Sequence, residues 1–371
     1  MCSSDLSYAD DILIENCDID ATNGIGGSYR IGVKNITIKD TKYSGGTIGT
    51  TYDFTRSAAD NSVETITIQN SDISAHASLQ AAGIGSGPYG TVKKISIENS
   101  TVEARGADGG AGIGTGGLPI DGVEVGLSGD LEEVSIVNST VEAYGEAGGA
   151  GIGSGRFTRQ ETIYIKDSTV IASGEDDDEY AELFGYTYQL GGAGIGAGWA
   201  ESSTSITIEG GTVTATGGYD SAAIGSSGCS GPYDGDNDFG LVRLMKDAEY
   251  CDIAIDGASV EATGGYAAAG IGGGAYADHK GKDSAIRIKD GIVASRGGTD
   301  GAGIGGGYHG TTVKDITIEG KSQVEAYGTH SAAGIGGGKQ SGASQVGTVT
   351  VDCETNEALD YYVYAYGADG V

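Results

Sequence analysis

The sequence is poor in proline, in phenylalanine and tryptophan, and in basic residues. Its 371 residues include 3 Pro, 4 Phe and 1 Trp, and 21 Lys and Arg stand against 52 Asp and Glu, which gives a net charge of -31. The low proline content and the lack of Gly at every third position exclude collagen. A strongly acidic surface repels phosphate groups, so we expect neither nucleic acid nor an anionic membrane surface as a partner.

Long apolar segments are also missing. No run approaches the roughly 18 residues that cross a bilayer, so we expect no membrane insertion by this segment. No basic start followed by an apolar stretch marks a signal peptide at Met1.

Glycine is abundant, with 70 residues spread evenly along the chain. Because Gly costs about 1 kcal/mol relative to Ala inside a helix, this distribution argues against most helical folds. Apolar residues make up 38% of the chain, which is enough Ile, Val and Ala to build a core. Disorder of the whole chain is therefore not expected.

A unit of ten residues recurs, as in ITIQNSDISA from Ile66, ISIENSTVEA from Ile95 and VSIVNSTVEA from Val134. Further copies and variants begin at Ile12, Ile36, Ile163, Ile206, Ile253, Ile286, Ile316 and Val349. Most copies lead, after a Gly-containing bend, into a segment of the form AAGIG or GAGIG. These segments are centred on Ile84, Ile113, Ile152, Ile195 and Ile304, with looser forms at Ile25, Ile224, Ile271 and Ile335.

Apolar and polar residues alternate within each copy, which is the period of a strand and not of a helix. Each copy therefore predicts three short strands, the third of them containing the Gly-Ile-Gly segment. A column of residues that tolerate a left-handed backbone predicts a tight corner between the first and second strands. The column comprises Asn16, Asp40, Asn70, Asn99, Asn138, Asp167, Gly210, Gly257, Asp290 and Gly320. Copies in register would stack as about eleven coils of parallel strands, in a rod on the order of 50 Å long.

A three-strand coil with an Asn-rich corner resembles the right-handed parallel β-helix of the pectate-lyase-like superfamily. The GAGIGGG and ITIEGGTVTA variants resemble Gly-rich repeat surface proteins of gut bacteria that are often labelled carbohydrate-binding. The resemblance implies an all-β solenoid, with the handedness taken from the family and from the usual chirality of parallel crossovers. It says little about function, because this scaffold hosts lyases, hydrolases, esterases, adhesins and inert stalks.

The repeats predict one domain over residues 12–371, preceded by a leader at 1–11 that we interpret as a candidate sequence artefact. Insertions are expected near 50–64, 117–132, 174–191 and 226–252. The end of the chain matches the middle of an earlier copy, so we expect the natural protein to continue in both directions.

Two columns predict binding surfaces. Gly on the outward positions of the third strand would leave a bare strip of backbone, on which a flat polymer could lie; the alternative is a strip covered by loops. Just past this strand lie aromatic residues whose rings could stack on sugars or could instead cover the rim of the core. This aromatic column consists of Tyr89, Phe157, Trp199, Tyr276 and Tyr308.

An acidic cluster in the last insertion, Asp234, Asp236 and Asp238, is a candidate calcium site because alternate carboxylates could converge on one hard cation. The match to an EF-hand is partial, since Phe239 and Met245 stand where Gly and Glu are required. Outward glutamates on the second strand, Glu103, Glu142, Glu261 and Glu325, would repel one another on adjacent coils unless a cation or a Lys side chain relieved the charge.

Catalytic motifs are sparse. The four His share no metal-ligand spacing, and no GxSxG turn lies between a strand and a helix. Arg287 and Lys289, near the carboxylates of neighbouring coils, are weak candidates for a lyase base. Cys229 and Cys251 bracket the last insertion and form a candidate disulfide in an exported protein.

Together these features predict a non-catalytic, exported surface protein: a glycan-binding or adhesive stalk with calcium as a candidate stabilising ion. The expected partner is a polysaccharide or a cell-surface glycan, and the expected location is extracellular or the cell surface. A polysaccharide-active enzyme of the same fold, either a lyase or a glycoside hydrolase, is the alternative, and an inert structural spacer is a second one.

Overall fold

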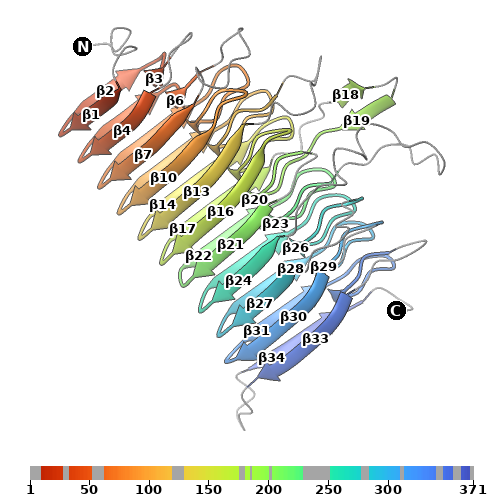
Figure 1. Cartoon of the computed structure of the whole chain (residues 1–371). Helices are drawn as coiled ribbons and strands as arrows, with labels where there is room; N and C mark the ends of the chain where they lie inside the picture. The colour runs from red at the N-terminus through yellow and green to blue at the C-terminus, as the bar shows by residue number, and fades with distance from the viewer. Residues whose placement is uncertain are drawn as a thin grey trace.

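The computed structural model describes residues 10–27, 33–51, 62–118, 129–174, 180–183, 186–199, 203–228, 251–276, 284–309, 313–339, 346–353 and 361–367. Within these ranges the chain contains strands and turns and no helix. The chain winds as a solenoid, so that strands far apart in sequence lie side by side from the N-terminal to the C-terminal coils (Figure 1).

Three parallel sheets run along the solenoid, with 11, 11 and 10 strands. The first sheet contains β1 (Asp11–Glu15), β4 (Val33–Lys39), β7 (Val63–Gln69), β10 (Val92–Glu98), β13 (Asp130–Val137), β16 (Arg159–Lys166), β21 (Ser203–Glu209), β24 (Asp252–Asp256), β27 (Ala285–Lys289), β30 (Val313–Gly320) and β33 (Val346–Cys353). The second sheet contains β2 (Asp18–Ala21), β5 (Lys42–Gly45), β8 (Asp72–His76), β11 (Thr101–Arg105), β14 (Thr140–Gly145), β17 (Thr169–Gly174), β22 (Thr212–Thr216), β25 (Ser259–Thr263), β28 (Ile292–Arg296), β31 (Gln323–Tyr327) and β34 (Tyr362–Tyr366).

The third sheet has the shortest strands. It contains β3 (Ile25–Gly27), β6 (Ile48–Thr50), β9 (Ile84–Gly85), β12 (Ile113–Gly114), β15 (Ile152–Gly153), β20 (Ile195–Gly196), β23 (Ile224–Gly225), β26 (Ile271–Gly272), β29 (Ile304–Gly305) and β32 (Ile335–Gly336). A separate antiparallel pair, β18 (Tyr180–Leu183) and β19 (Tyr186–Gln189), lies within the insertion expected at 174–191. The predicted all-β fold with three strands per coil and about eleven coils is confirmed.

The core consists of apolar residues stacked in columns along the axis. In the first sheet Ile66, Ile95 and Val134 pair in register from coil to coil, and all are fully buried. In the second sheet Val102 and Val141 pair in the same way. Because the inward side chains of each coil meet their counterparts 4.8 Å away, the repeat in the sequence becomes a continuous core.

The corner between the first two sheets has the predicted left-handed backbone. Every residue of the corner column has a positive φ, from 47° at Asp40 to 69° at Gly320. Asn, Asp and Gly carry the lowest cost in this conformation, which explains why the column contains only these residues.

The residue after the corner forms a hydroxyl ladder that the sequence analysis did not identify. Each hydroxyl donates to the carbonyl two residues before it, and each Ser hydroxyl also accepts from a backbone N–H of the preceding coil. The N–H of Ser100 donates to Ser139 Oγ at 3.2 Å, and Ser139 Oγ donates to the carbonyl of Val137 at 2.8 Å. The ladder continues through Thr41, Ser71, Ser100, Ser139 and Ser168.

The outward Gly residues of the third sheet do not leave an exposed strip of backbone. In the coil of β12, the N–H of Ala111 donates to the carbonyl of Thr115, so that the chain closes tightly around Ile113. A Cβ on Gly114 would lie 1.6 Å from the carbonyl oxygen of Gly153 in the next coil. The glycines of this segment are buried, and the backbone at Arg105 lies against Gly83. Close stacking of coils and loops therefore accounts for the Gly-rich segment, as the packing alternative predicted.

Candidate functional site

A groove lies on the outer face of the second sheet, over five successive coils. It has a volume of about 340 Å³. We call it the second-sheet groove; it is lined by Thr212, Val213, Thr214, Ser259, Val260, Glu261, Ile292, Val293, Ala294, Gln323, Glu325 and Tyr362. The strands β22, β25, β28, β31 and β34 pair in this order, so the groove crosses strands and follows the solenoid axis.

The depth of the groove arises from one small residue. Ala294 on β28 pairs in register with Glu261 on one side and Glu325 on the other. The methyl group of Ala294 is far shorter than either neighbour, so the surface is hollowed between two carboxylates. Beside it, Ile292 exposes 55% of its surface and gives the groove an apolar wall.

Tyrosines surround the C-terminal end of the groove. Tyr362 donates its hydroxyl to Glu325 at 3.3 Å, and Tyr327 donates to the other oxygen of the same carboxylate at 2.8 Å. Tyr327 also stacks on Tyr366 with 4.8 Å between centroids and an interplanar angle of 4°. The guanidinium of Arg296 lies over the ring of Tyr327, 5.1 Å from its centroid. These contacts hold Glu325 and the tyrosine rings in fixed positions at the groove.

Among the described residues, a second combination of Arg, Tyr and Glu lies on this sheet. Arg105 lies 4.1 Å from the centroid of Tyr144, whose hydroxyl donates to Glu142 at 3.1 Å. Glu103, which pairs with Glu142 in register, contacts Arg105 at 3.2 Å and His76 at 3.6 Å. The repulsion expected between these adjacent glutamates is thus relieved by side chains of the protein itself.

The predicted aromatic column divides into two parts. Tyr89, Phe157 and Trp199 are buried, with 6%, 5% and 0% of their surface exposed, and Phe157 packs on Trp199 at 5.2 Å. These three rings suit the alternative in which the column covers the rim of the core. Tyr276 and Tyr308 are half-buried and contact each other edge to face at 5.4 Å. Ligand binding by these two residues stays a prediction.

Tyr276 and Tyr308 belong to a larger ring cluster. His309 stacks on Tyr276 at 5.4 Å and contacts Tyr308 at 4.1 Å. Burial, with smaller contributions from Tyr308 and Asp220, raises the pKa of Tyr276 to about 12. Burial lowers the pKa of His309, because the charged imidazolium is poorly solvated there.

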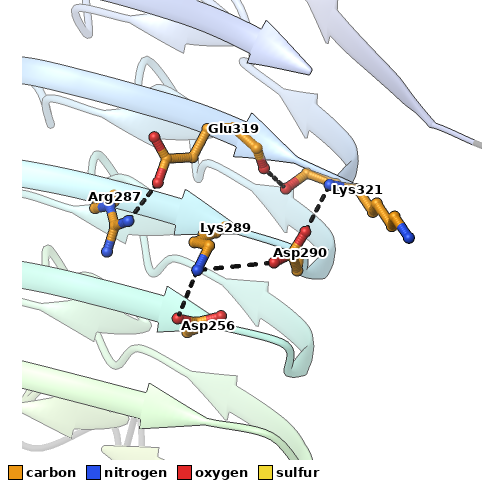
Figure 2. A network of polar contacts seen from close by, with 7 residues as sticks. Asp256, Arg287, Lys289, Asp290, Glu319 and Lys321 are labelled. Carbon is orange, nitrogen blue, oxygen red and sulfur yellow. Dashed lines mark hydrogen bonds and ion pairs between the residues drawn. The ribbon is translucent and has the colours of Figure 1, made fainter. Parts of the chain in front are cut away.

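Arg287 and Lys289, the weak catalytic candidates, lie in an ion-pair network on the first sheet. Figure 2 shows Arg287 of β27 against Glu319 of β30, and Lys289 between Asp256 and Asp290. Lys289 Nζ lies 3.7 Å from Asp256 and 3.9 Å from Asp290. Each of the two basic residues thus pairs with a carboxylate of a neighbouring coil, Arg287 with Glu319 and Lys289 with Asp256, which gives both a structural role.

One cluster resembles part of a nucleophilic relay. Ser74 Oγ lies 3.4 Å from His76 Nε2, and Glu103 Oε1 lies 3.6 Å from the same nitrogen. A relay requires the carboxylate and the hydroxyl on opposite ring nitrogens. The arrangement therefore does not form a Ser-His-Glu relay.

The calcium and disulfide predictions depend on residues outside the described ranges. Asp234, Asp236, Asp238 and Cys229 are among them, while Cys251 is buried just before β24. In the described ranges, no group of three or more His, Cys, Asp or Glu is placed to hold a metal ion. No helix in these ranges has the length and apolar character needed to cross a membrane.

Three parallel sheets joined coil by coil define the chain as a parallel β-helix. A family model described as the beta helix repeat matches residues 95–117, 134–156, 163–199, 206–228, 253–275 and 316–339. Six segments of this solenoid thus match the beta helix repeat, and the three parallel sheets fit the right-handed form of the fold. No curated protein and no solved structure matches the chain.

Sequence reasoning identified Glu261 and Glu325 only as members of a column and missed the groove between them. The column continues from Thr214 through Glu261, Ala294 and Glu325 to Tyr364. The drop in size at Ala294 was a visible signal. Its meaning depended on knowing which residues are neighbours across coils.

Proposed function

We propose that this protein is a non-catalytic glycan-binding stalk, exported to the cell surface, and that the second-sheet groove holds the sugar. The observation that carries the proposal is the groove itself, a hollow on the outer face of the second sheet that is flanked by tyrosine and carboxylate side chains. Its volume of about 340 Å³ lies within the range of ligand sites.

The lining suits a carbohydrate. Ile292 and the ring of Tyr362 offer apolar surface to the C–H face of a sugar. The side chains of Glu261, Gln323 and Glu325 offer acceptors to its hydroxyls. Because the groove follows the solenoid axis, an extended oligosaccharide would lie across the strands, with successive sugars on successive coils.

Ala294→Trp tests this proposal, because a large ring at the floor of the groove fills the hollow. The matched control is Ser44→Trp, at the equivalent outward position of β5, seven coils away by pairing order. Retention on insoluble polysaccharides and on a glycan array is measured with and without calcium. We expect the wild type and Ser44→Trp to be retained, and Ala294→Trp to lose at least tenfold in affinity.

The same assay separates the competing functions. Soluble sugars or unsaturated ends released into the supernatant would establish an enzyme and refute the non-catalytic proposal. Equal retention of Ala294→Trp would place the binding surface elsewhere, with Tyr276 and Tyr308 the next residues to change. No retention of the wild type on any glycan would favour the spacer. Loss of retention on calcium removal would support the predicted site at Asp234, Asp236 and Asp238.

A further inference from the structure

The four outward glutamates of the second sheet differ in how their charges are compensated. Glu103 contacts Arg105 and His76, Glu142 accepts from Tyr144, and Glu325 accepts from two tyrosine hydroxyls. Glu261 makes no hydrogen bond or ion pair with any residue in the described part of the chain. It is exposed, and its in-register neighbours are Thr214 and Ala294, which carry no charge.

The groove therefore has a net negative charge that the protein leaves uncompensated. Its twelve lining residues include two carboxylates and no Lys, Arg or His. The basic residue beside it, Arg296, lies over the ring of Tyr327. A chain with a net charge of -31 adds to the negative potential here.

We propose that the second-sheet groove selects a glycan that carries free amines, such as a glucosamine oligomer, over the corresponding neutral or acidic glycan. Glu261 and Glu325 lie on alternate coils, about 9.6 Å apart along the axis at 4.8 Å per coil, with the hollow over Ala294 between them. An ammonium group held in this hollow donates to Glu261 and lies near Glu325. A uronic acid would place a third carboxylate at the same point.

The expected selectivity follows from replacing one hydroxyl of the sugar by an ammonium group. A charge-assisted hydrogen bond is about twice as strong as a neutral one, which corresponds to a preference of roughly tenfold for the amine. Surface attraction without a site would also favour a polycation. The test must therefore separate the contribution of Glu261 from that of the general negative charge.

Isothermal titration calorimetry is done with the whole chain, at near-physiological salt and at a pH that keeps the sugar amines protonated. It compares β-1,4-linked tetramers of glucosamine, glucose, N-acetylglucosamine and glucuronic acid. The variant is Glu261→Gln, and the matched control is Glu142→Gln, which removes the same charge from the same sheet outside the groove. We expect the wild type to bind the glucosamine tetramer about tenfold more tightly than the glucose tetramer. Glu261→Gln should abolish this preference without weakening glucose binding, and Glu142→Gln should retain it.

This inference rests on the proposed function, but the two fail differently. Equal affinity for the amine and neutral tetramers would refute the amine selectivity and leave glycan binding intact. A preference that Glu261→Gln and Glu142→Gln reduce equally would also refute it, since the attraction would then come from the overall charge. No binding of any tetramer would overturn both proposals.

Discussion

Removing one hydroxyl of the Ser ladder should loosen one coil by a calculable amount. In Ser139→Ala, the N–H of Ser100 loses its acceptor, and this group is buried between coils. The carbonyl of Val137 also loses a donor, but it still accepts from the N–H of Asn99 at 3.1 Å. The main cost is therefore one buried, unsatisfied N–H, which is worth about 2 kcal/mol.

The assay is amide hydrogen exchange at Ser100, because a long repeat array does not unfold as a single two-state unit. A local loss of about 2 kcal/mol corresponds to exchange roughly thirtyfold faster. Ser139→Thr should keep the wild-type rate, since Thr41 fills the same position of the ladder. Ser135→Ala, on the outer face of β13, is the control and should change stability by less than about 0.5 kcal/mol.

The reasoning would be refuted if exchange at Ser100 in Ser139→Ala matched that of Ser135→Ala. It would also be refuted if Ser139→Thr exchanged as fast as Ser139→Ala. Either result would mean that the hydroxyl contributes little to the junction between these coils.

Two further predictions concern packing and pH. Gly114→Ala should lower the melting temperature strongly or prevent folding, because its Cβ would lie 1.6 Å from the oxygen of Gly153 at a φ of 149°. Gly257→Asn should be tolerated, since a Cβ there meets nothing within 4 Å and Asn suits the left-handed backbone of the corner. Equal melting temperatures for Gly114→Ala and Gly257→Asn would contradict the packing argument. Because burial lowers the pKa of His309, the unfolded chain binds more protons just below pH 6.5, and stability should fall as pH drops from neutral through that window. Denaturant midpoints of wild type and His309→Phe should then diverge with pH, and parallel curves would contradict the assignment.

The corner column shows which features of the fold could be predicted from the sequence. The three residue types of the column, as at Asn99, Asp167 and Gly210, share one conformational property, so their spacing predicted both the bend and its register. The alternation around Ile95 and Val102 likewise predicted which side chains face the core, because a strand has a period of two.

The aromatic column shows that the exposure of a side chain could not be predicted from the repeat alone. Trp199 and Tyr308 occupy equivalent places after the third strand, yet Trp199 is fully buried and Tyr308 is half-buried. Exposure depends on which turns of neighbouring coils cover each ring. Phe157, which packs on Trp199, lies 42 positions earlier in the chain.

The sequence by itself determined the strands, the corners and the repeat, because each depends on the backbone preferences and alternation of adjacent residues. Only the tertiary structure decided the second-sheet groove, since its floor, walls and charges come from separate coils. Glu261, Ala294 and Glu325 are 33 and 31 positions apart and become neighbours only through parallel pairing. The hollow arises because the side chain of Ala294 is shorter than those of its neighbours, and these residues become neighbours only when the coils stack in register.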